Sequence, residues 1–363
     1  MPDVYAVIMA GGVGSRFWPR SREKSPKQLL EIVNRDTMIQ NTVRRVSDLI
    51  EPKNILIVTN KVQKPSVLKQ LPQIPASNVI VEPFGRNTAA CIGLASLFVR
   101  QNNPEAVMVV LPADHIMQNE EEFRRVLGLA IWVAYESKKL ITVGIQPTRP
   151  DTGYGYIQIV DAEEDAANPY LERGVHRVKT FAEKPNLATA QQFLESGDFL
   201  WNSGMFIWRA DAILREIERL LPEMYQELSK IDESIGTEKY EHVLDSAYRI
   251  MRSISIDYGV MEKANDVYVI KGSFGWSDVG SWDEVYRVSG KDEKGNSVTG
   301  KAHLQNTTNT LVYAGDKFVA TIGVDDLIVI STDDAVLVCK RDSSQEVKEV
   351  VDYLRRKQMN DLL

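Results

Sequence analysis

The sequence predicts an α/β protein with a Rossmann-like, mixed but mainly parallel sheet, helices on both faces, a small C-terminal β-helix-like module and a terminal helix. Two observations support this prediction. In the first part of the chain, short apolar runs alternate with segments whose apolar residues recur at helical spacing, as is typical of parallel strands buried on both faces. Beyond about residue 290, the pattern changes to short β-rich runs separated by Gly or Asp turns.

The first half of the expected sheet consists of five apolar runs and the helices between them. The runs are expected to form strands at 4–9, 55–58, 79–81, 106–111 and 140–143. The intervening segments are expected to form helices at 37–50, 61–71, 87–99 and 120–136. Because ligands of such sheets bind beyond the carboxyl ends of the strands, we expect the loop after the first strand, Glu82 and Asp114 to lie at one edge.

The middle of the chain, residues 150–289, resembles an insertion that extends the same sheet and adds a second wall at that edge. Its expected elements are strands at 156–159, 178–181, 205–208 and 267–270 and a helix at 211–221. Turn and charge signals at 289–296 indicate a boundary. We therefore expect a large domain at 1–289, divided near residue 150.

The remaining residues, 290–363, form what we call the C-terminal module. Its expected strands are 310–314, 318–322, 327–331 and 335–339. A terminal helix follows, with an expected capping box of Ser343 and Glu346 and an apolar stripe that includes Val347 and Leu354. The module contains no catalytic constellation, so we expect it to serve packing or dimerisation, and we expect a homodimer.

Composition excludes several classes of function. The net charge of -7 over 363 residues argues against a nucleic-acid partner. No apolar run approaches the ~20 residues that span a bilayer, and the chain enters its first strand without a secretory leader pattern. Cys91 and Cys339 are far apart and have no metal-site spacing, so we expect free thiols. These observations predict a cytoplasmic protein without a membrane partner.

The glycine-rich loop, residues 10–28, follows the first expected strand and carries Arg16 and Lys27. Glycines allow backbone N–H groups to converge on anionic oxygens, and the two cations neutralise what the amides cannot. A dinucleotide fingerprint would need glycine where Phe17 stands, and the Walker pattern is absent. The loop therefore predicts phosphate binding, although an ordinary strand-to-helix turn would also be glycine-rich.

Two carboxylates follow apolar segments far apart in the chain. Asp114 lies in Leu-Pro-Ala-Asp-His at the end of the fourth expected strand, and Asp278 lies between glycines and tryptophans. Mg²⁺ prefers such oxygens, with phosphates and waters completing its shell. The alternatives are a helix N-cap for Asp114 and an Asx turn for Asp278. We expect His115 to be a packing residue.

Glu82 begins the segment Glu-Pro-Phe-Gly-Arg-Asn-Thr that follows the third expected strand. Guanine presents two adjacent N–H donors that one carboxylate can accept, whereas adenine has no such donor pair. We therefore expect Glu82 to read guanine. Arg86 either reaches a phosphate or braces the loop through a salt bridge.

The middle region carries residue types suited to a sugar phosphate. Glu183 and Asn202 suit hydroxyl groups, Lys184 suits a phosphate, and Gly155 permits close approach of the backbone. Each motif alone is weak, because glycine turns and surface Glu–Lys pairs are abundant. Asp257 and Glu262 have two possible roles: to support the site or to satisfy buried backbone groups.

Together these motifs resemble the sugar-1-phosphate nucleotidylyltransferase family, and in particular its bacterial mannose-1-phosphate guanylyltransferase branch. The resemblance runs in order over residues 4–283. Phe17 stands where the family usually has Leu, and Ala182 where it usually has Val. Many members carry a C-terminal isomerase domain, which we do not expect in this chain.

The resemblance implies a reaction and a set of roles. GMP passes from GTP to α-D-mannose 1-phosphate, giving GDP-mannose and pyrophosphate, by Mg²⁺-assisted in-line attack without a covalent intermediate. Residues 1–149 bind the nucleotide and 150–289 the sugar phosphate. Catalytic roles fall to Arg16 and Lys27. Nucleotide-binding roles fall to Ala10, Gly11, Gly12, Gly14, Ser15, Glu82, Arg86, Asn87, Thr88, Pro112 and Asp114. Sugar-phosphate-binding roles fall to Gly155, Glu183, Lys184, Asn202 and Asp257, and metal-binding roles to Asp114 and Asp278.

Three alternatives remain open on the sequence. The first is a transferase that uses another hexose or heptose 1-phosphate, or another nucleotide, since mannose and glucose differ only at C2. A dinucleotide-dependent oxidoreductase is disfavoured by the missing third glycine and by Val58-Thr-Asn60, where an acidic residue would end the second strand. A catalytically inactive sugar-nucleotide sensor is disfavoured by the presence of Arg16, Lys27, Asp114 and Asp278.

Overall fold

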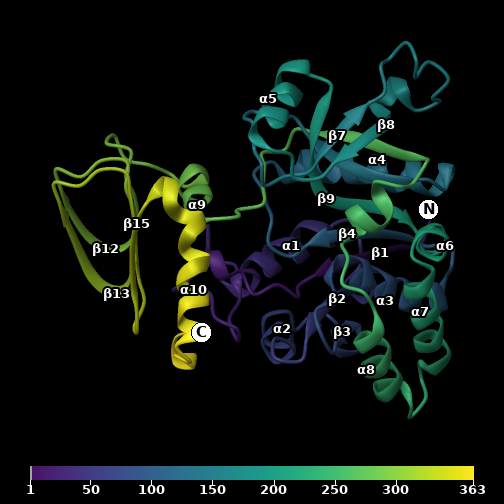
Figure 1. The fold of residues 1–363 in the computed structure, drawn as a ribbon, viewed down its shortest axis with the longest axis horizontal. Coiled ribbons are helices and arrows are strands. Elements are labelled where there is room, and N and C mark those ends of the chain that lie inside the picture. Colours follow the sequence, from purple (N-terminus) through teal and green to yellow (C-terminus); the bar gives the residue numbers. More distant parts are fainter. Residues whose placement is uncertain (1) are drawn as a thin grey trace.

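The computed structural model describes residues 2–363, whose largest element is a nine-stranded mixed sheet (Figure 1). Its strand order is β3-β2-β1-β4-β9-β6-β10-β8-β7. The strands are β1 (Val4–Met9), β2 (Ile55–Asn60), β3 (Val79–Glu82), β4 (Val107–Pro112), β6 (Leu140–Ile145), β7 (Tyr156–Ile159), β8 (Val175–Ala182), β9 (Phe199–Arg209) and β10 (Val267–Gly272). The predicted Rossmann-like mixed sheet is confirmed, although parallel pairing dominates only one half of it and most pairings in the other half are antiparallel.

One half of this sheet is parallel and buried on both faces. Strand β1 pairs in parallel with β2 and β4, and β2 pairs in parallel with β3. Their carboxyl ends therefore share one edge, where β1 releases the glycine-rich loop, β3 ends at Glu82 and β4 ends at Pro112. The expectation that the loop, Glu82 and Asp114 share an edge is confirmed.

The other half of the sheet is organised by β9, which runs antiparallel to both β4 and β6. The first residues of β9 also pair with β7, which pairs with β8, which in turn pairs with β10 beside β6. These pairings close a circuit of five strands. Residues 150–289 thus extend the first half of the sheet, as expected, and a single strand belongs to both halves.

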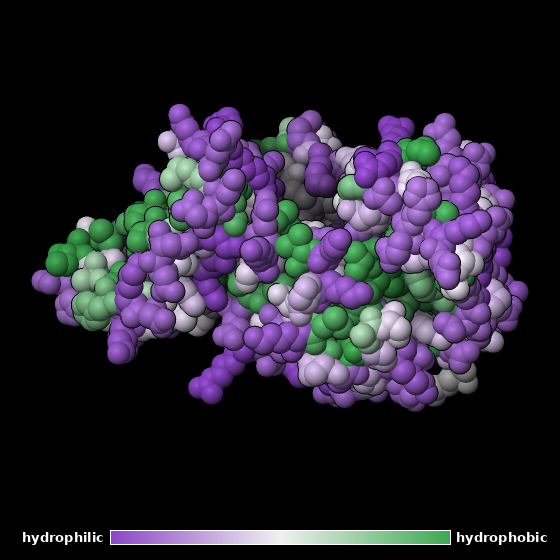
Figure 2. Space-filling view, turned by 90° about the horizontal axis from the view of Figure 1, so that it is seen from below, coloured by the Kyte–Doolittle hydropathy of each residue, from purple (hydrophilic) through white to green (hydrophobic). Residues whose placement is uncertain are grey.

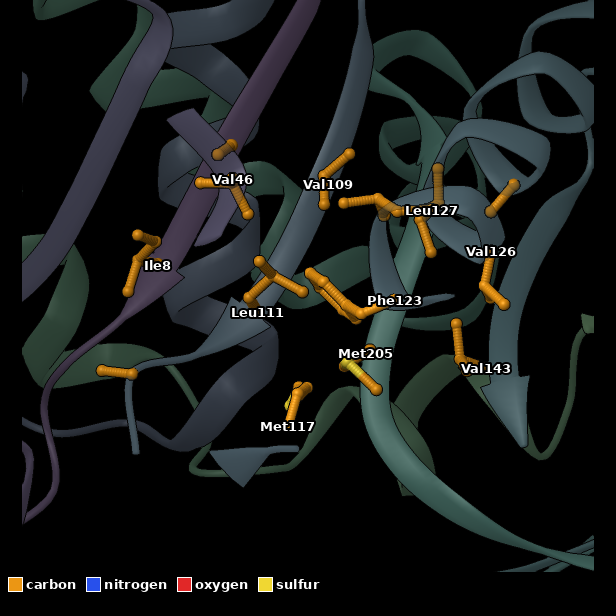
Figure 3. Close-up of a cluster of buried hydrophobic side chains, with 14 of the residues drawn as sticks. Ile8, Val46, Val109, Leu111, Met117, Phe123, Val126, Leu127, Val143 and Met205 are labelled. Carbon is orange, nitrogen blue, oxygen red and sulfur yellow. The ribbon is translucent and has the colours of Figure 1, made fainter. Parts of the chain in front are cut away.

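Helices cover both faces of the sheet and form two main cores. On one face lie α1 (Met38–Ser47), α2 (Lys64–Gln70) and α4 (Glu120–Ser137). Figure 3 shows apolar side chains of α1 and α4 packed with those of β4 and β9. On the other face lie α3 (Asn87–Asn102), α6 (Ala210–Leu220), α7 (Pro222–Ser234) and α8 (Tyr240–Ile250). The short helix α5 (Leu187–Ser196) packs beside β9. Within residues 2–363, no helix is both long and apolar enough to cross a membrane.

The C-terminal module stands beside the large domain at one end of the molecule (Figure 1). Its strands β12 (Ser297–Gln305), β13 (Leu311–Ile322) and β14 (Leu327–Ser331) pair in parallel, and β15 (Val336–Lys340) closes the sheet antiparallel to β14. Helices α9 (Trp282–Val288) and α10 (Val347–Arg356) link it to the large domain through a third apolar cluster.

Three local expectations needed correction. Strand β9 begins at Phe199 rather than at Met205, so Asn202 lies within a strand. In the module, β12 was not expected, and the two strands expected at 310–314 and 318–322 form one long strand, β13. The capping box at Ser343 is wrong, because residues Arg341–Glu346 form a 3₁₀ turn that leads into α10, whose N-cap residue makes no side-chain cap.

Candidate active site

The glycine-rich loop leaves β1 at Met9 and depends on Gly14. Gly14 has φ of 64°, and a Cβ there would lie 2.5 Å from the Cβ of Lys27. Only glycine suits both the left-handed backbone and this close approach. The short 3₁₀ turn η1 (Ser15–Phe17) follows and places Arg16 on the surface, where it forms no ion pair with any residue between 2 and 363.

Two buried glutamines hold the loop from inside, and neither had been predicted as a functional residue. The amide nitrogen of Gln28 donates to the carbonyl oxygens of Ala10 and Gly12, at 3.0 and 2.9 Å. The amide nitrogen of Gln63 donates to the same Gly12 oxygen at 3.2 Å. Because these carbonyl oxygens accept hydrogen bonds from buried side chains, the loop is anchored to the protein while Gly11 and Gly12 stay exposed.

Lys27 joins the two segments that carry the predicted metal ligands. Its side chain is almost fully buried, and its ammonium donates to Asp114 Oδ2 at 2.9 Å and to the backbone oxygen of Asp278 at 2.6 Å. Burial tends to raise the pKa of Asp114, but Lys27 and His115 outweigh this effect and hold that pKa below its ordinary value. Asp114 is therefore a carboxylate at neutral pH.

The two carboxylates fit a divalent metal ion that is completed by other ligands. Tyr154 donates its hydroxyl to Asp278 Oδ1 at 2.7 Å, so each carboxylate keeps one oxygen without a side-chain donor from residues 2–363. The Asp114 side chain is 34% exposed and thus accessible. No group of three or more His, Cys, Asp or Glu suited to a metal occurs in the described chain. Phosphate oxygens and water would have to supply the remaining ligands.

His115 packs against Trp276 at the edge of the sheet. The indole N–H of Trp276 donates to His115 Nδ1 at 3.2 Å, and the two rings meet edge to face. Burial lowers the pKa of His115 despite the nearby carboxylates of Asp114 and Asp278. The neutral imidazole accepts this hydrogen bond from the indole N–H and thereby holds the segment on which Asp278 lies.

Glu82 is a buried carboxyl group that forms no ion pair within residues 2–363. Only 6% of the residue is exposed, and its one side-chain partner among residues 2–363 is the Tyr248 hydroxyl at 3.1 Å. Burial raises the pKa of Glu82 to about 7, and the hydrogen bond from Tyr248 opposes this rise only in part. A Cβ on Gly11 would lie 3.6 Å from Glu82 Oε2, so the carboxyl group adjoins the glycine-rich loop.

The segment after Glu82 connects the start of α3 to elements of the other half. Arg86 donates to the carbonyl oxygens of Tyr248 and Arg249, at 2.6 and 3.0 Å. This favours the bracing role, through backbone carbonyls instead of a salt bridge. Asn87 has φ of 66° and accepts the Thr88 N–H, and the Thr88 hydroxyl accepts the N–H of Ile256 at 2.8 Å.

A cavity of about 210 Å³ lies where these segments meet. Its lining combines predicted nucleotide, sugar and metal residues with apolar and aromatic side chains. Predicted site residues in the lining are Thr88, Pro112, Gly155, Glu183, Asn202, Asp257 and Asp278. The others are Met9, His115, Gly153, Tyr154, Ser203, Gly204, Phe206 and Trp276. The structure thus brings together residues from distant stretches of the sequence.

The polar residues predicted to bind the sugar phosphate are held by one another. Asn202 Nδ2 donates to Asp257 Oδ1 at 2.7 Å, and Asp257 begins a short π-helical turn, η6 (Asp257–Met261). Burial and the charge of Glu183 raise the pKa of Asp257. Glu183 pairs with Lys184, and a Cβ on Gly155 would collide with the Glu183 carboxylate.

Comparison with known proteins decides the family. The nucleotidyl transferase family matches residues 5–295, and the MannoseP isomerase/GMP-like beta-helix domain matches residues 304–354. The chain belongs to the nucleotidyl transferase family. Members of this family generally use a divalent metal ion, which agrees with the carboxylate pair described above.

Individual relatives of this nucleotidyl transferase are similar over nearly its whole length. A protein of Klebsiella pneumoniae named mannose-1-phosphate guanylyltransferase is 40% identical, over 98% of this chain and 74% of that protein. A protein of the same name from Escherichia coli K12 is 39% identical, over 97% and 73%. A crystal structure from Thermus thermophilus, described as a mannose-1-phosphate geranyltransferase, superimposes with a TM-score of 0.87 at 34% identity, covering 97% of this chain and 99% of that chain.

Proposed function

We propose that this nucleotidyl transferase transfers GMP from GTP to α-D-mannose 1-phosphate, giving GDP-mannose and pyrophosphate. The observation that carries the proposal is Lys27. Its buried ammonium belongs to the glycine-rich loop and contacts both Asp114 and the backbone of Asp278. A triphosphate on the loop would meet a fixed cation and two carboxylates at the edge of the sheet. The names of the Klebsiella and Escherichia relatives indicate guanine as the base and mannose as the sugar.

The proposed chemistry requires positioning and charge stabilisation but no protein nucleophile. An oxygen of the anomeric phosphate attacks the α-phosphorus of GTP, and the bond to the departing pyrophosphate breaks in line. The attacking oxygen is already anionic, so the protein need not remove a proton. Exposed Arg16 and the loop amides of residues 11–15 bind the triphosphate, and Lys27 stabilises charge that develops at the reacting phosphate.

Mg²⁺ is the ion we propose for the carboxylate pair. Asp114 and Asp278 would hold it, since hard carboxylate oxygens together with phosphates and water suit this ion. When bound, it would neutralise negative charge on the triphosphate. Tyr154 keeps Asp278 oriented and Lys27 keeps Asp114 oriented, so both carboxylates are positioned by the protein's own groups.

We propose that Glu82 selects guanine. A buried carboxyl group with a single neutral partner has unused acceptor capacity, and guanine would fill it with two N–H donors. Arg86, Asn87 and Thr88 belong to the same nucleotide-binding part in this proposal, with Arg86 acting by bracing α8. Ala10, Ser15 and Pro112 complete it.

We propose that the sugar phosphate occupies the cavity of about 210 Å³. Glu183 and Asn202 form hydrogen bonds with the hydroxyl groups of the sugar, and Asp257 holds the Asn202 amide in place. Lys184, whose side chain is 57% exposed, binds the phosphate after leaving its present pair with Glu183. Gly155 leaves the space that a side chain would fill.

The deciding assay measures pyrophosphate release over a matrix of nucleoside triphosphates and sugar 1-phosphates. We expect release with GTP and mannose 1-phosphate, and only when Mg²⁺ or a similar ion is present. Faster release with another sugar would replace mannose with that sugar. Release with no combination, together with measurable binding of GDP-mannose, would establish the sensor instead.

We further propose that the protein acts in the cytoplasm as a homodimer, with the division at residues 149 and 289 that the sequence predicts. Cys91 and Cys339 are free thiols in the structure. Figure 2 shows apolar side chains on the surface at the end formed by the C-terminal module. Within this module, Phe318 and Ile322 are exposed. Light scattering of the full chain, compared with a Phe318→Asp variant, tests this; a monomer in both would contradict the dimer.

A further inference from the structure

The glycine-rich loop is held on two sides by different parts of the molecule. On one side, Gln63 of the large domain and the loop's own Gln28 donate hydrogen bonds to its carbonyl oxygens. On the other side, its middle rests on the C-terminal module, because Phe17 and Trp18 are buried in the apolar cluster that also contains α10 and β14. The residue between Ser15 and Phe17 is Arg16, which we assign to the triphosphate.

Two polar contacts fix the loop to the module at points on either side of a short turn. The indole N–H of Trp18 donates to the backbone oxygen of Leu362 at 3.0 Å. Further along the loop, Arg22 Nη2 donates to both oxygens of Asp334, at 2.8 and 3.1 Å. Between these points the Arg20 guanidinium stacks over the Tyr313 ring at 4.1 Å.

The contact between Arg22 and Asp334 lies close to Lys27 along the chain and helps to fix the position of Lys27. The Arg22 side chain is mostly buried, and its Nη1 has no hydrogen-bond partner in the described chain. Its pairing with Asp334 is therefore the main compensation for burying the guanidinium. The backbone of Arg22 pairs with that of Ser25 in both directions. Because Ser25 closely precedes Lys27 in the chain, the anchored turn leads directly to the proposed catalytic cation.

We propose that the C-terminal module positions the glycine-rich loop, with Trp18, Arg22 and Asp334 as positioning residues. The module thus takes part in the reaction without touching the substrates. Weakening either contact should let the 11–18 segment move, and a misplaced Arg16 or Lys27 lowers turnover although the fold persists. The kinetic part of this inference rests on the proposed function, whereas the mobility part does not.

The test uses Trp18→Phe, which keeps an aromatic ring but removes the donor, and Asp334→Asn, which keeps the shape but removes the charge. Amide hydrogen exchange should be about tenfold faster at residues 11–18 in each variant and unchanged at residues 55–60. Turnover should fall about tenfold, with the KM for mannose 1-phosphate unchanged. Asp334→Glu should restore part of the turnover.

The matched control is Asp232→Asn, which removes the Arg100 ion pair between α3 and α7, far from the loop. It should change neither exchange at residues 11–18 nor turnover. Unchanged amide exchange at residues 11–18 in both Trp18→Phe and Asp334→Asn would overturn the inference. An equal loss of turnover in the Asp232→Asn control would also overturn it. Absence of any transfer activity in the unmodified protein would instead refute the proposed function, and the exchange comparison would still decide the positioning role.

Discussion

Replacing Glu82 with Gln tests base selection and the electrostatics of a buried carboxyl group together. Burial raises the pKa of Glu82 from its ordinary 4.5 to about 7. Between these two pH values the folded protein retains a proton that the unfolded chain releases, so stability falls as the pH rises from about 4.5 to 7. The total loss is about 3 kcal/mol, worked from the difference between the two pKa values. Glu82→Gln should remove this loss.

Binding of guanine should have the opposite pH dependence, because the base needs the ionised carboxylate. The ratio of kcat/KM for GTP to that for ATP should rise about tenfold between pH 6 and pH 8. The ratio is the proper measure because the two triphosphate groups titrate alike. In Glu82→Gln the ratio should become independent of pH and fall about 10- to 100-fold, since one acceptor is lost.

The matched control is Glu227→Gln, which changes another buried glutamate, one that pairs with Lys230 on α7. It should leave the GTP-to-ATP ratio and its pH dependence as they are. A pH-independent ratio in the unmodified protein, or full guanine preference in Glu82→Gln, would refute the assignment of Glu82 to the base. Chemical unfolding at pH 5 and pH 8 provides the separate stability measurement.

Three further substitutions test the catalytic edge. Lys27→Ala should lower turnover by about 100-fold or more, because a preorganised cation is lost; near-normal turnover would remove Lys27 from the mechanism. Asp114→Asn should shift the Mg²⁺ titration of activity to higher concentration, and an unchanged titration would contradict the ligand assignment. Tyr154→Phe removes the donor to Asp278 and should weaken Mn²⁺ binding by calorimetry about tenfold, while equal affinity would show that Tyr154 only packs.

Local sequence patterns were sufficient for the strands of the parallel half and for the shared edge. Their apolar runs are nearly continuous, and their loops carry glycine and charged residues where ligands are expected. The beginning of β9 escaped detection, because Asn202, Ser203 and Gly204 interrupt its apolar run. Its strand conformation comes from pairing with β7 and β6, which no local pattern reports.

The supporting residues of the site were harder to predict than the residues they support. Gln28 and Gln63 act through backbone carbonyls, and an amide side chain in such a role has no distinctive spacing. Tyr154 reaches Asp278 across 124 residues, a pairing that depends on the closed circuit of strands. Most of the predicted substrate-binding residues lie at strand ends and in loops of recognisable composition, with Asn202 inside β9 as an exception. Their supporting residues are defined only by the tertiary fold.

The path of β9 limits how this enzyme could be recombined with its relatives. Asn202, which we propose binds the sugar, and Phe206, which pairs with Val110 of β4, lie on one continuous strand. The pairing of β9 with β6 is irregular between Thr142 and Gly144, and a side chain at Gly144 would collide with Leu200. A chimera that imports a new sugar specificity must therefore keep this irregularity in place. A shift of the register by one residue would turn the inward side chains of β9 outward and disrupt the proposed binding sites of the two substrates.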